Sequence, residues 1–324
     1  MRLALFLPAL ALLASPSTEP LAWAPEAGTR LERRIEHRNL TAMDDFRVEM
    51  GGQEVPSEYL PQMEFEIRSS GVLAVTDELV AVGPGRPEVL LRRYDEIEAE
   101  ASESFSMTGM DPSEESGSAG SALVGEEVRF AWSDDEDGFV ASSPSGAEEL
   151  PDGLGEDLGL RALLPTESVA VGDAWELDGA LFTGLHRPGG DLGLVWSRSE
   201  GMRGDYDEVT DLGGTLDATL VSVEEGVARI EITGELEGVE EETSDLEEVP
   251  MVDGTAKVVT TTTYDVEAVL LWDVEHGHLA SFELSADALL EMETTKDEGQ
   301  PGPTYVSLMS FSGAWELTVE VERL

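Results

Sequence analysis

The clearest pattern along the chain is a period-two alternation of apolar and polar residues in its C-terminal half. Even positions between 258 and 272 carry apolar, aromatic or β-branched side chains, whereas Asp265 and Glu267 fall on the opposite face. Such alternation predicts a long, half-buried β-strand. A turn centred on Gly277 follows, and the alternation resumes over residues 280–286. Together the two segments predict a long antiparallel hairpin.

Similar alternation elsewhere predicts further antiparallel strands. The segments are residues 216–223 with 227–236, residues 305–321, residues 29–37, residues 63–68, and residues 128–132 with 139–141. Helical spacing of leucines is clearest in residues 154–164, which Pro165 ends. Residues 88–101 form neither a clean strand face nor a clean helical face.

These patterns predict a mainly β protein with one or two short helices. Long antiparallel strands in successive hairpins favour a curved sheet or an open barrel, and the alternative is a β-sandwich. We favour the curved sheet because it can wrap around a helix such as residues 154–164. Several large side chains are expected on inward faces, where they either fill a solid core or line a cavity. They are Trp132, Trp175, Tyr264, Trp272, Phe282, Phe311 and Trp315.

The start of the chain has the pattern of a targeting segment. Residues 1–14 combine one arginine, a short apolar run and a small-residue exit, which is typical of a secretory signal peptide. Cleavage is expected near Ala14–Ser15, or as late as Ala22 or Ala24. The apolar run is shorter than the roughly 20 residues that a transmembrane helix needs. We therefore expect an exported protein, periplasmic or extracellular, that is not an integral membrane protein.

The rest of the chain divides by composition into three parts. Residues 25–101 predict an N-terminal β part, and residues 123–324 predict the main antiparallel β part, in one domain with the first. Between them, residues 102–122 are acidic and rich in Gly and Ser, which predicts a linker or loop. Residues 235–248 carry eight acids and predict a solvated loop.

The composition of the chain mainly excludes certain kinds of site and partner. The 324 residues include 69 Asp and Glu against 19 Lys and Arg, which gives a net charge of −50. Nucleic-acid binding is therefore not expected, since phosphates require cationic partners. The chain has no Cys, so disulfides, thiolate metal sites and Cys nucleophiles are excluded. A hydrophobic content of 41% is nevertheless enough to form a core.

One pair of histidines has the spacing of a metal site. His276 and His278 form a His-x-His pair, but Gly277 places them in the predicted turn. Both imidazoles are therefore expected to face solvent. A metal site would need a third ligand, for which Asp273 and Glu275 are the candidates. We accordingly assign no metal, catalytic or cofactor-binding residue from the sequence.

Acidic segments make weak calcium binding an alternative. Residues 134–138 resemble a calcium loop, but the EF-hand pattern fails because Pro144 would occupy its last ligand position. An acidic hairpin turn is the simpler interpretation there, and residues 240–248 are a second candidate. Carboxylate pairs for glycoside hydrolysis cannot be recognised from spacing, since 69 acids allow any pairing.

One basic residue is expected on an inward face. If residues 29–37 alternate as a strand, Arg33 and His37 share a face with Leu31 and Ile35. An inward Arg can pair with an acid or hold an anionic head group. A β-bulge or an edge strand is the simpler explanation.

Two short motifs give the chain a resemblance to known proteins. Residues 165–175 resemble a Pro-x-x-x-Val-x-Val-Gly-Asp-x-Trp element of uncharacterised, exported, β-rich bacterial proteins, and residues 272–279 resemble their aromatic-Asp-x-x-x-Gly-x-Leu hairpin. Physically, Val-Gly-Asp is a tight turn that starts a strand, and Trp175 is a core anchor. The resemblance implies export and a β-rich fold, and it implies no activity.

Three functional hypotheses follow. The leading one is a non-enzymatic binding or interaction protein of the periplasm or cell envelope, whose partner is an apolar ligand or an envelope protein. Its sharpest form is a carrier with an apolar cavity inside the curved sheet. The alternatives are a calcium-dependent envelope or adhesion protein and a hydrolase that uses a pair of acids.

Overall fold

One large antiparallel sheet dominates the computed structural model, which describes residues 21–144, 146, 150–156, 160–198, 211–245, 255–296 and 304–324. Its long strands are β1 (Arg30–Met50), β3 (Met63–Gly83), β4 (Arg86–Met107), β10 (Gly213–Glu224), β11 (Val227–Asp245), β12 (Thr255–Asp273), β13 (His278–Lys296) and β14 (Tyr305–Arg323). The short strands are β2 (Gln53–Glu54), β5 (Ser113–Ser121), β6 (Glu127–Ser133), β7 (Gly138–Ser142), β8 (Ala174–Asp178) and β9 (Leu194–Arg198). Helical turns are η1 (Ser57–Tyr59), η2 (Arg161–Leu163), α1 (Ala180–Thr183) and η3 (Gly184–His186).

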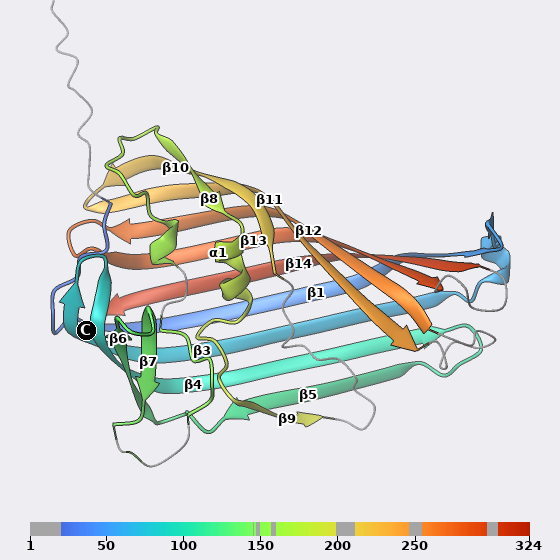
Figure 1. Cartoon of the computed structure of the whole chain (residues 1–324), viewed down its shortest axis with the longest axis horizontal. Helices are drawn as coiled ribbons and strands as arrows, with labels where there is room; N and C mark the ends of the chain where they lie inside the picture. The colour runs from blue at the N-terminus through green and yellow to red at the C-terminus, as the bar shows by residue number, and fades with distance from the viewer. Residues whose placement is uncertain are drawn as a thin grey trace, which may run out of the picture.

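The strand order shows how the sheet is assembled. It runs β7-β6-β4-β3-β1-β14-β13-β12-β11-β10-β8, and β5 and β9 continue the sheet beside the second half of β4. β1 joins the first and last thirds of the chain, because it pairs with β3 on one side and with β14 on the other. The described sheet is therefore open and curved, as the alternation predicts (Figure 1).

A hydrophobic core fills the concave face at the broad end of the sheet. Phe182 of α1 and Leu185 of η3 are buried in the same cluster as Trp272, Phe282 and Trp315 of the strands. Figure 1 shows α1 lying over the strands at that end, so the sheet does wrap around a short helix. Within the described ranges, no helix is long and apolar enough to cross a membrane.

The predicted helix over residues 154–164 is wrong. Leu154 forms a β-bridge with Gly190, and helical geometry is limited to the single turn η2, while residues 157–159 lie outside the described part. Leu160 and Leu163 are still buried. The spacing of the leucines therefore reflects their packing in the core and not a helix. The helix that the sheet wraps instead begins at Ala180.

The predicted linker at residues 102–122 is also wrong. β4 continues to Met107, and β5 pairs with it from Ser113 opposite Phe105 to Gly120 opposite Glu98. The small residues of β5 are typical of loops, but here they alternate between the two faces: Gly117 and Ala119 point inward, and Ser116 and Ser118 point outward. The acidic run after residue 235 is strand as well, since β11 extends to Asp245; residues 246–248 lie outside the described part.

A register shift explains why residues 88–101 show no clean face. Leu90, Arg92 and Tyr94 point inward, and after the shift opposite Ala74 and Val75 the inward positions become odd, beginning with Ile97. An extra residue in one strand reverses the parity of every later side chain.

Candidate functional site

The concave face changes character along the strands. At the broad end of β14, Trp315, Leu317 and Val319 are each 1% exposed. Farther along the same face of β14, Met309 is only half-buried. Eight apolar residues on this half of the inward face, which also carries Glu103 and Glu115, form what we call the apolar trough. They are Phe46, Phe65, Ile67, Phe105, Leu290, Met292, Met309 and Phe311.

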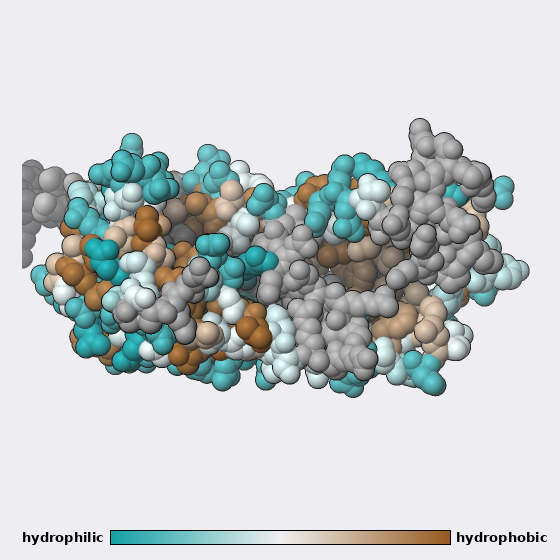
Figure 2. All heavy atoms as spheres, turned by 60° about the horizontal axis from the view of Figure 1, so that its bottom comes forward, coloured by the Kyte–Doolittle hydropathy of each residue, from teal (hydrophilic) through white to brown (hydrophobic). Residues whose placement is uncertain are grey.

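The apolar trough is a hollow rather than a packed core. All its members except Phe311 are half-buried, although they point to the same side as the buried core. Phe65 of β3 and Phe311 of β14 meet edge to face across β1, with ring centroids 6.2 Å apart, which shows how strongly the sheet curves inward. Figure 2 shows this hollow as a brown depression in the half of the molecule opposite the core.

A smaller cavity lies where the core meets the apolar trough. Its volume is about 420 Å³, within the range of small-molecule sites. The segment 186–196 closes it over β1, β3 and β4. Its apolar lining includes Leu73, Ile97, Leu192, Leu194 and Trp196, and its polar and charged lining includes His37, Glu98, Glu100, His186, Arg187 and Asp191.

Two histidines face this cavity, and one of them is held neutral. His186 stacks on Trp315 with ring centroids 3.9 Å apart and lies 5.5 Å from the Tyr264 ring. Burial, with a smaller contribution from the nearby His37, lowers the pKa of His186 to about 4. The His186 imidazole is therefore uncharged at neutral pH and can donate or accept a hydrogen bond.

His37 occupies the inward position that the sequence predicts, and a glycine makes room for it. A Cβ atom at Gly71 would lie 2.6 Å from Cε1 and 2.7 Å from Nε2 of His37. The two residues are opposite each other on β1 and β3. Only glycine therefore leaves the imidazole in its place over the cavity.

Arg33 also points inward, and its neighbour in space is an acid. Its Nε lies 3.5 Å from Oδ2 of the buried Asp77, which Arg92 binds through two hydrogen bonds of 2.7 and 3.0 Å. β1 is a central strand, and its register shifts only at Met43/Asp45. The pairing interpretation of an inward Arg is thus confirmed, and a bulge or edge strand at this position is wrong.

Buried acids in the described ranges are ion-paired. Although burial alone would raise the pKa of Asp77, Arg92 and Arg33 together hold it below its usual range. Glu156 is paired with Arg161 at 2.7 Å. Arg92 also donates to the carbonyls of Gly155 and Glu156, which ties the segment before η2 to the sheet. Asp77 is therefore an ionised structural group rather than a protonated acid catalyst.

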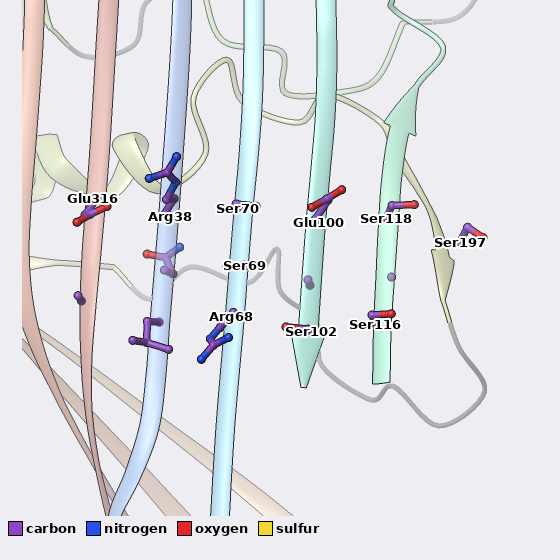
Figure 3. Close-up of a pocket in the computed structure, with 15 residues that line it drawn as sticks. Arg38, Arg68, Ser69, Ser70, Glu100, Ser102, Ser116, Ser118, Ser197 and Glu316 are labelled. Carbon is purple, nitrogen blue, oxygen red and sulfur yellow. The ribbon is translucent and has the colours of Figure 1, made fainter. Parts of the chain in front are cut away.

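A second hollow lies on the outer face of the sheet. It has a volume of about 800 Å³, and Figure 3 shows Arg38 and Arg68 on neighbouring strands, flanked by Glu100 and Glu316. The remaining labelled lining residues are all serines, from β3, β4, β5 and β9. Two positive and two negative side chains balance in this hollow, so it selects for neither charge. The concave face is the stronger candidate site.

The predicted turn residues lie at the broad end. The turn at Gly277 joins β12 to β13, but His278 is buried, so its predicted exposure is wrong; His276 is half-buried. In the other acidic turn, residues 134–137 are exposed, and Asp134 accepts a hydrogen bond from the Trp132 indole. Trp175 is half-buried and donates to the Leu163 carbonyl, after a turn in which Gly172 has a φ of 96°.

Sequence reasoning missed His186, Gly71 and Trp196. His186 lies in a Gly- and Pro-rich segment without periodicity, and nothing in the sequence pairs Gly71 with His37 before the register of β1 and β3 is known.

Comparisons with known proteins do not identify the chain. No protein-family model matches it, and no curated protein matches it. Among solved structures, the InvG secretin domain β-barrel from the Salmonella SPI-1 injectisome has a TM-score of 0.16 and 8% identity, over 92% of this chain and 64% of that one. A near-atomic resolution structure of the same secretin gives the same TM-score and identity, over 66% of its chain. A TM-score of this size carries no argument about fold or function.

Proposed function

We propose that this chain is an exported, non-enzymatic binding protein of the periplasm or cell envelope that carries a ligand with a long apolar chain. The apolar trough would hold that chain, and the cavity beside His37 and His186 would hold its polar end. Export rests on the signal-peptide pattern of residues 1–14. The ligand class rests on the chemistry of the concave face.

One observation carries the proposal: inward apolar side chains of β13 and β14 pass from buried at the broad end to half-buried at Leu290, Met292 and Met309. Trp315 and Leu317 are 1% exposed, whereas Met309, Leu290 and Met292 keep contact with solvent on the same face. Each Å² of apolar surface removed from water stabilises a complex by roughly 25 cal/mol. Contiguous apolar surface in a concavity is the usual setting of a ligand. An apolar chain lying along β14 and its neighbours would complete the core.

The polar end of the ligand is inferred from the cavity. The cavity combines apolar walls with two imidazoles and with charged side chains such as Arg187 and Asp191. His186 is neutral above pH 5 or so, since its pKa is about 4. The neutral imidazole of His186 would hold a head group by a hydrogen bond. A single-chain amphiphile, such as a fatty acid or a lipid with one acyl chain, fits this arrangement.

Two neighbouring leucines of β13 provide a matched test. Leu290 points into the apolar trough, while Leu289 is 46% exposed on the opposite face. Binding of a dansylated long-chain fatty acid would be measured by fluorescence for the wild type, Leu290→Glu and Leu289→Glu. We expect Leu290→Glu to weaken binding at least about tenfold, because a carboxylate against an acyl chain is unsatisfied. Leu289→Glu is expected to bind as the wild type does.

The controls separate folding from binding. Melting curves and circular dichroism would show that both variants keep the β fold. A folded Leu290→Glu variant with unchanged affinity would place the probe elsewhere and reject the proposal, as would a wild type that does not bind the probe.

A further inference from the structure

The turn between β12 and β13 gathers three metal-ligand side chains. One ligand atom from each of Asp273, His276 and His278 lies within 4.8 Å of the others. The His276 and His278 rings are 6.0 Å apart and inclined by only 28°. Oδ2 of Asp273 is 2.8 Å from Nδ1 of His276. This cluster is at the broad end of the sheet, and the apolar trough lies along the opposite ends of the same strands.

The backbone fixes this turn from two sides. Val274 donates to the carbonyl of Gly226 in the adjacent hairpin, and the carbonyl of Gly277 accepts from Ala24. A Cβ atom at Gly277 would lie 2.7 Å from the nitrogen of Ala24, so the chain passes directly over the turn. The turn is complete without its histidine side chains, because Gly277 donates to the Asp273 carbonyl and the His276 amide donates to Oδ1 of Asp273.

His278 supplies the independent observation. The residue is 4% exposed, and its Nδ1 lies 2.7 Å from the carbonyl oxygen of Leu279. A carbonyl only accepts, so Nδ1 carries the proton and Nε2 carries the lone pair. Nε2 is buried and has no hydrogen-bond partner among the described residues. A buried acceptor without a partner costs free energy, and an imidazole whose other nitrogen donates to a backbone carbonyl is the usual form of a metal-binding histidine.

We propose that Asp273, His276 and His278 form a binding site for a divalent transition-metal ion of the zinc type. Two imidazole nitrogens and one carboxylate oxygen match the ligands that zinc prefers, and they disfavour calcium and magnesium, which take oxygen ligands. Solvent or a partner group would provide a fourth ligand. Zinc bonds of about 2.0–2.2 Å place ligand atoms roughly 3.4 Å apart, so ligand atoms now up to 4.8 Å apart would close around the ion. A metal bound through Oδ2 of Asp273 and Nδ1 of His276 would replace the hydrogen bond between them.

The charged side chains around the cluster are compatible with the binding of a cation. Arg33 acts electrostatically on His278, but its guanidinium is 3.5 Å from the carboxylate of Asp77. Asp273 and the exposed Glu275 add negative charge on the turn itself. This site does not depend on the proposed ligand of the apolar trough.

The test uses the chain without a histidine tag, stripped of metal by a chelator. Zinc would be titrated in competition with a chromophoric chelator, for the wild type, His276→Ala, His278→Gln and the control Glu275→Gln on the same turn. We expect one tightly bound zinc per wild-type and Glu275→Gln chain. Loss of a ligand is expected to weaken binding at least about tenfold, as even loss of a supporting group does. Cobalt in the wild type is expected to show the visible spectrum of a four-coordinate ion.

Three results would overturn the site. They are no zinc uptake by the wild type against the competitor, equal uptake by His276→Ala, or displacement of zinc by a thousandfold excess of calcium. The last two would mean that surface carboxylates hold the metal. His276 is half-buried on a turn, so its replacement keeps the test decisive even if His278→Gln fails to fold.

Discussion

The imidazole of His186 lies stacked on the indole of Trp315, with ring centroids 3.9 Å apart and planes inclined by 17°. Trp315 belongs to the fully buried core, whereas His186 lines the cavity beside the apolar trough. The pair thus marks the boundary between the part of the concave face that the chain fills itself and the part that it leaves open.

This stack predicts a pH dependence of stability. The pKa of His186 is about 4 in the folded state, below its ordinary value of 6.5, so the unfolded chain binds the proton first as the pH falls. The resulting loss of stability begins near pH 6.5 and is complete near pH 4. A full shift converts to about 3 kcal/mol, and partial exposure reduces it to about 2 kcal/mol. His186→Phe, which keeps the stack without a titrating group, would serve as the comparison in chemical denaturation at pH 7 and pH 4. If both proteins lose the same stability, the imidazole is not held neutral.

The buried ion pair between Asp77 and Arg92 predicts a large effect of one substitution. Asp77→Asn would leave the 1%-exposed Arg92 without its counter-charge, which typically costs about 3–5 kcal/mol of unfolding free energy. Asp95→Asn removes the negative charge beside the exposed Arg93, while the amide oxygen can still accept from the Thr76 hydroxyl, so stability is expected to change by less than about 1 kcal/mol. Urea unfolding of both variants checks the contrast. Equal losses of unfolding free energy in the two variants would show that burial does not determine how much these ion pairs contribute to stability.

Gly71 and His37 are expected to be energetically coupled. Gly71→Ala places a methyl group against the His37 ring, so it is expected to destabilise the chain by about 1–3 kcal/mol. In a His37→Ala background the same change should cost much less, because the contact is gone. A double-mutant cycle by thermal unfolding measures the coupling. Additive effects would mean that the ring moves aside freely.

The N-terminal segment predicts where export processing occurs. Leu21 and Trp23 are buried in the core, and the amide of Ala24 donates to Gly277. Cleavage near Ala14–Ser15 keeps these contacts, whereas cleavage after Ala22 or Ala24 removes them. N-terminal sequencing of the exported protein is therefore expected to begin before Leu21. A mature chain starting at Pro25 would contradict this expectation.

Sequence alone predicted those parts of the fold in which alternation is uninterrupted. β12 and β13 follow their period-two patterns closely. The inward position of Arg33 could be predicted because β1 alternates without a register shift as far as Met43. β4 was ambiguous because a register shift reverses its parity halfway. β5 was hidden by its loop-like composition, and η2 by leucines that reach the core from an irregular segment.

The site was less predictable than the fold because it depends on which strands become neighbours. The sheet places His37 opposite Gly71, and the segment 186–196 brings His186 onto Trp315, although these residues are far apart in sequence. The turn at Gly277 was predicted correctly, but its histidines were expected in solvent. His278 is buried, and the chain at Ala24 passes over the adjacent Gly277; local spacing reveals neither.

Mass spectrometry of the mature protein, purified gently from an exporting host, tests the central claim most directly. Under native conditions we predict a mass above that of the polypeptide, which disappears on denaturation and is recovered as an amphiphile with a long apolar chain. The Leu290→Glu variant should lack this excess, and Leu289→Glu should keep it. A wild-type protein that shows the bare polypeptide mass, and takes up no long-chain fatty acid when one is added, would contradict the account.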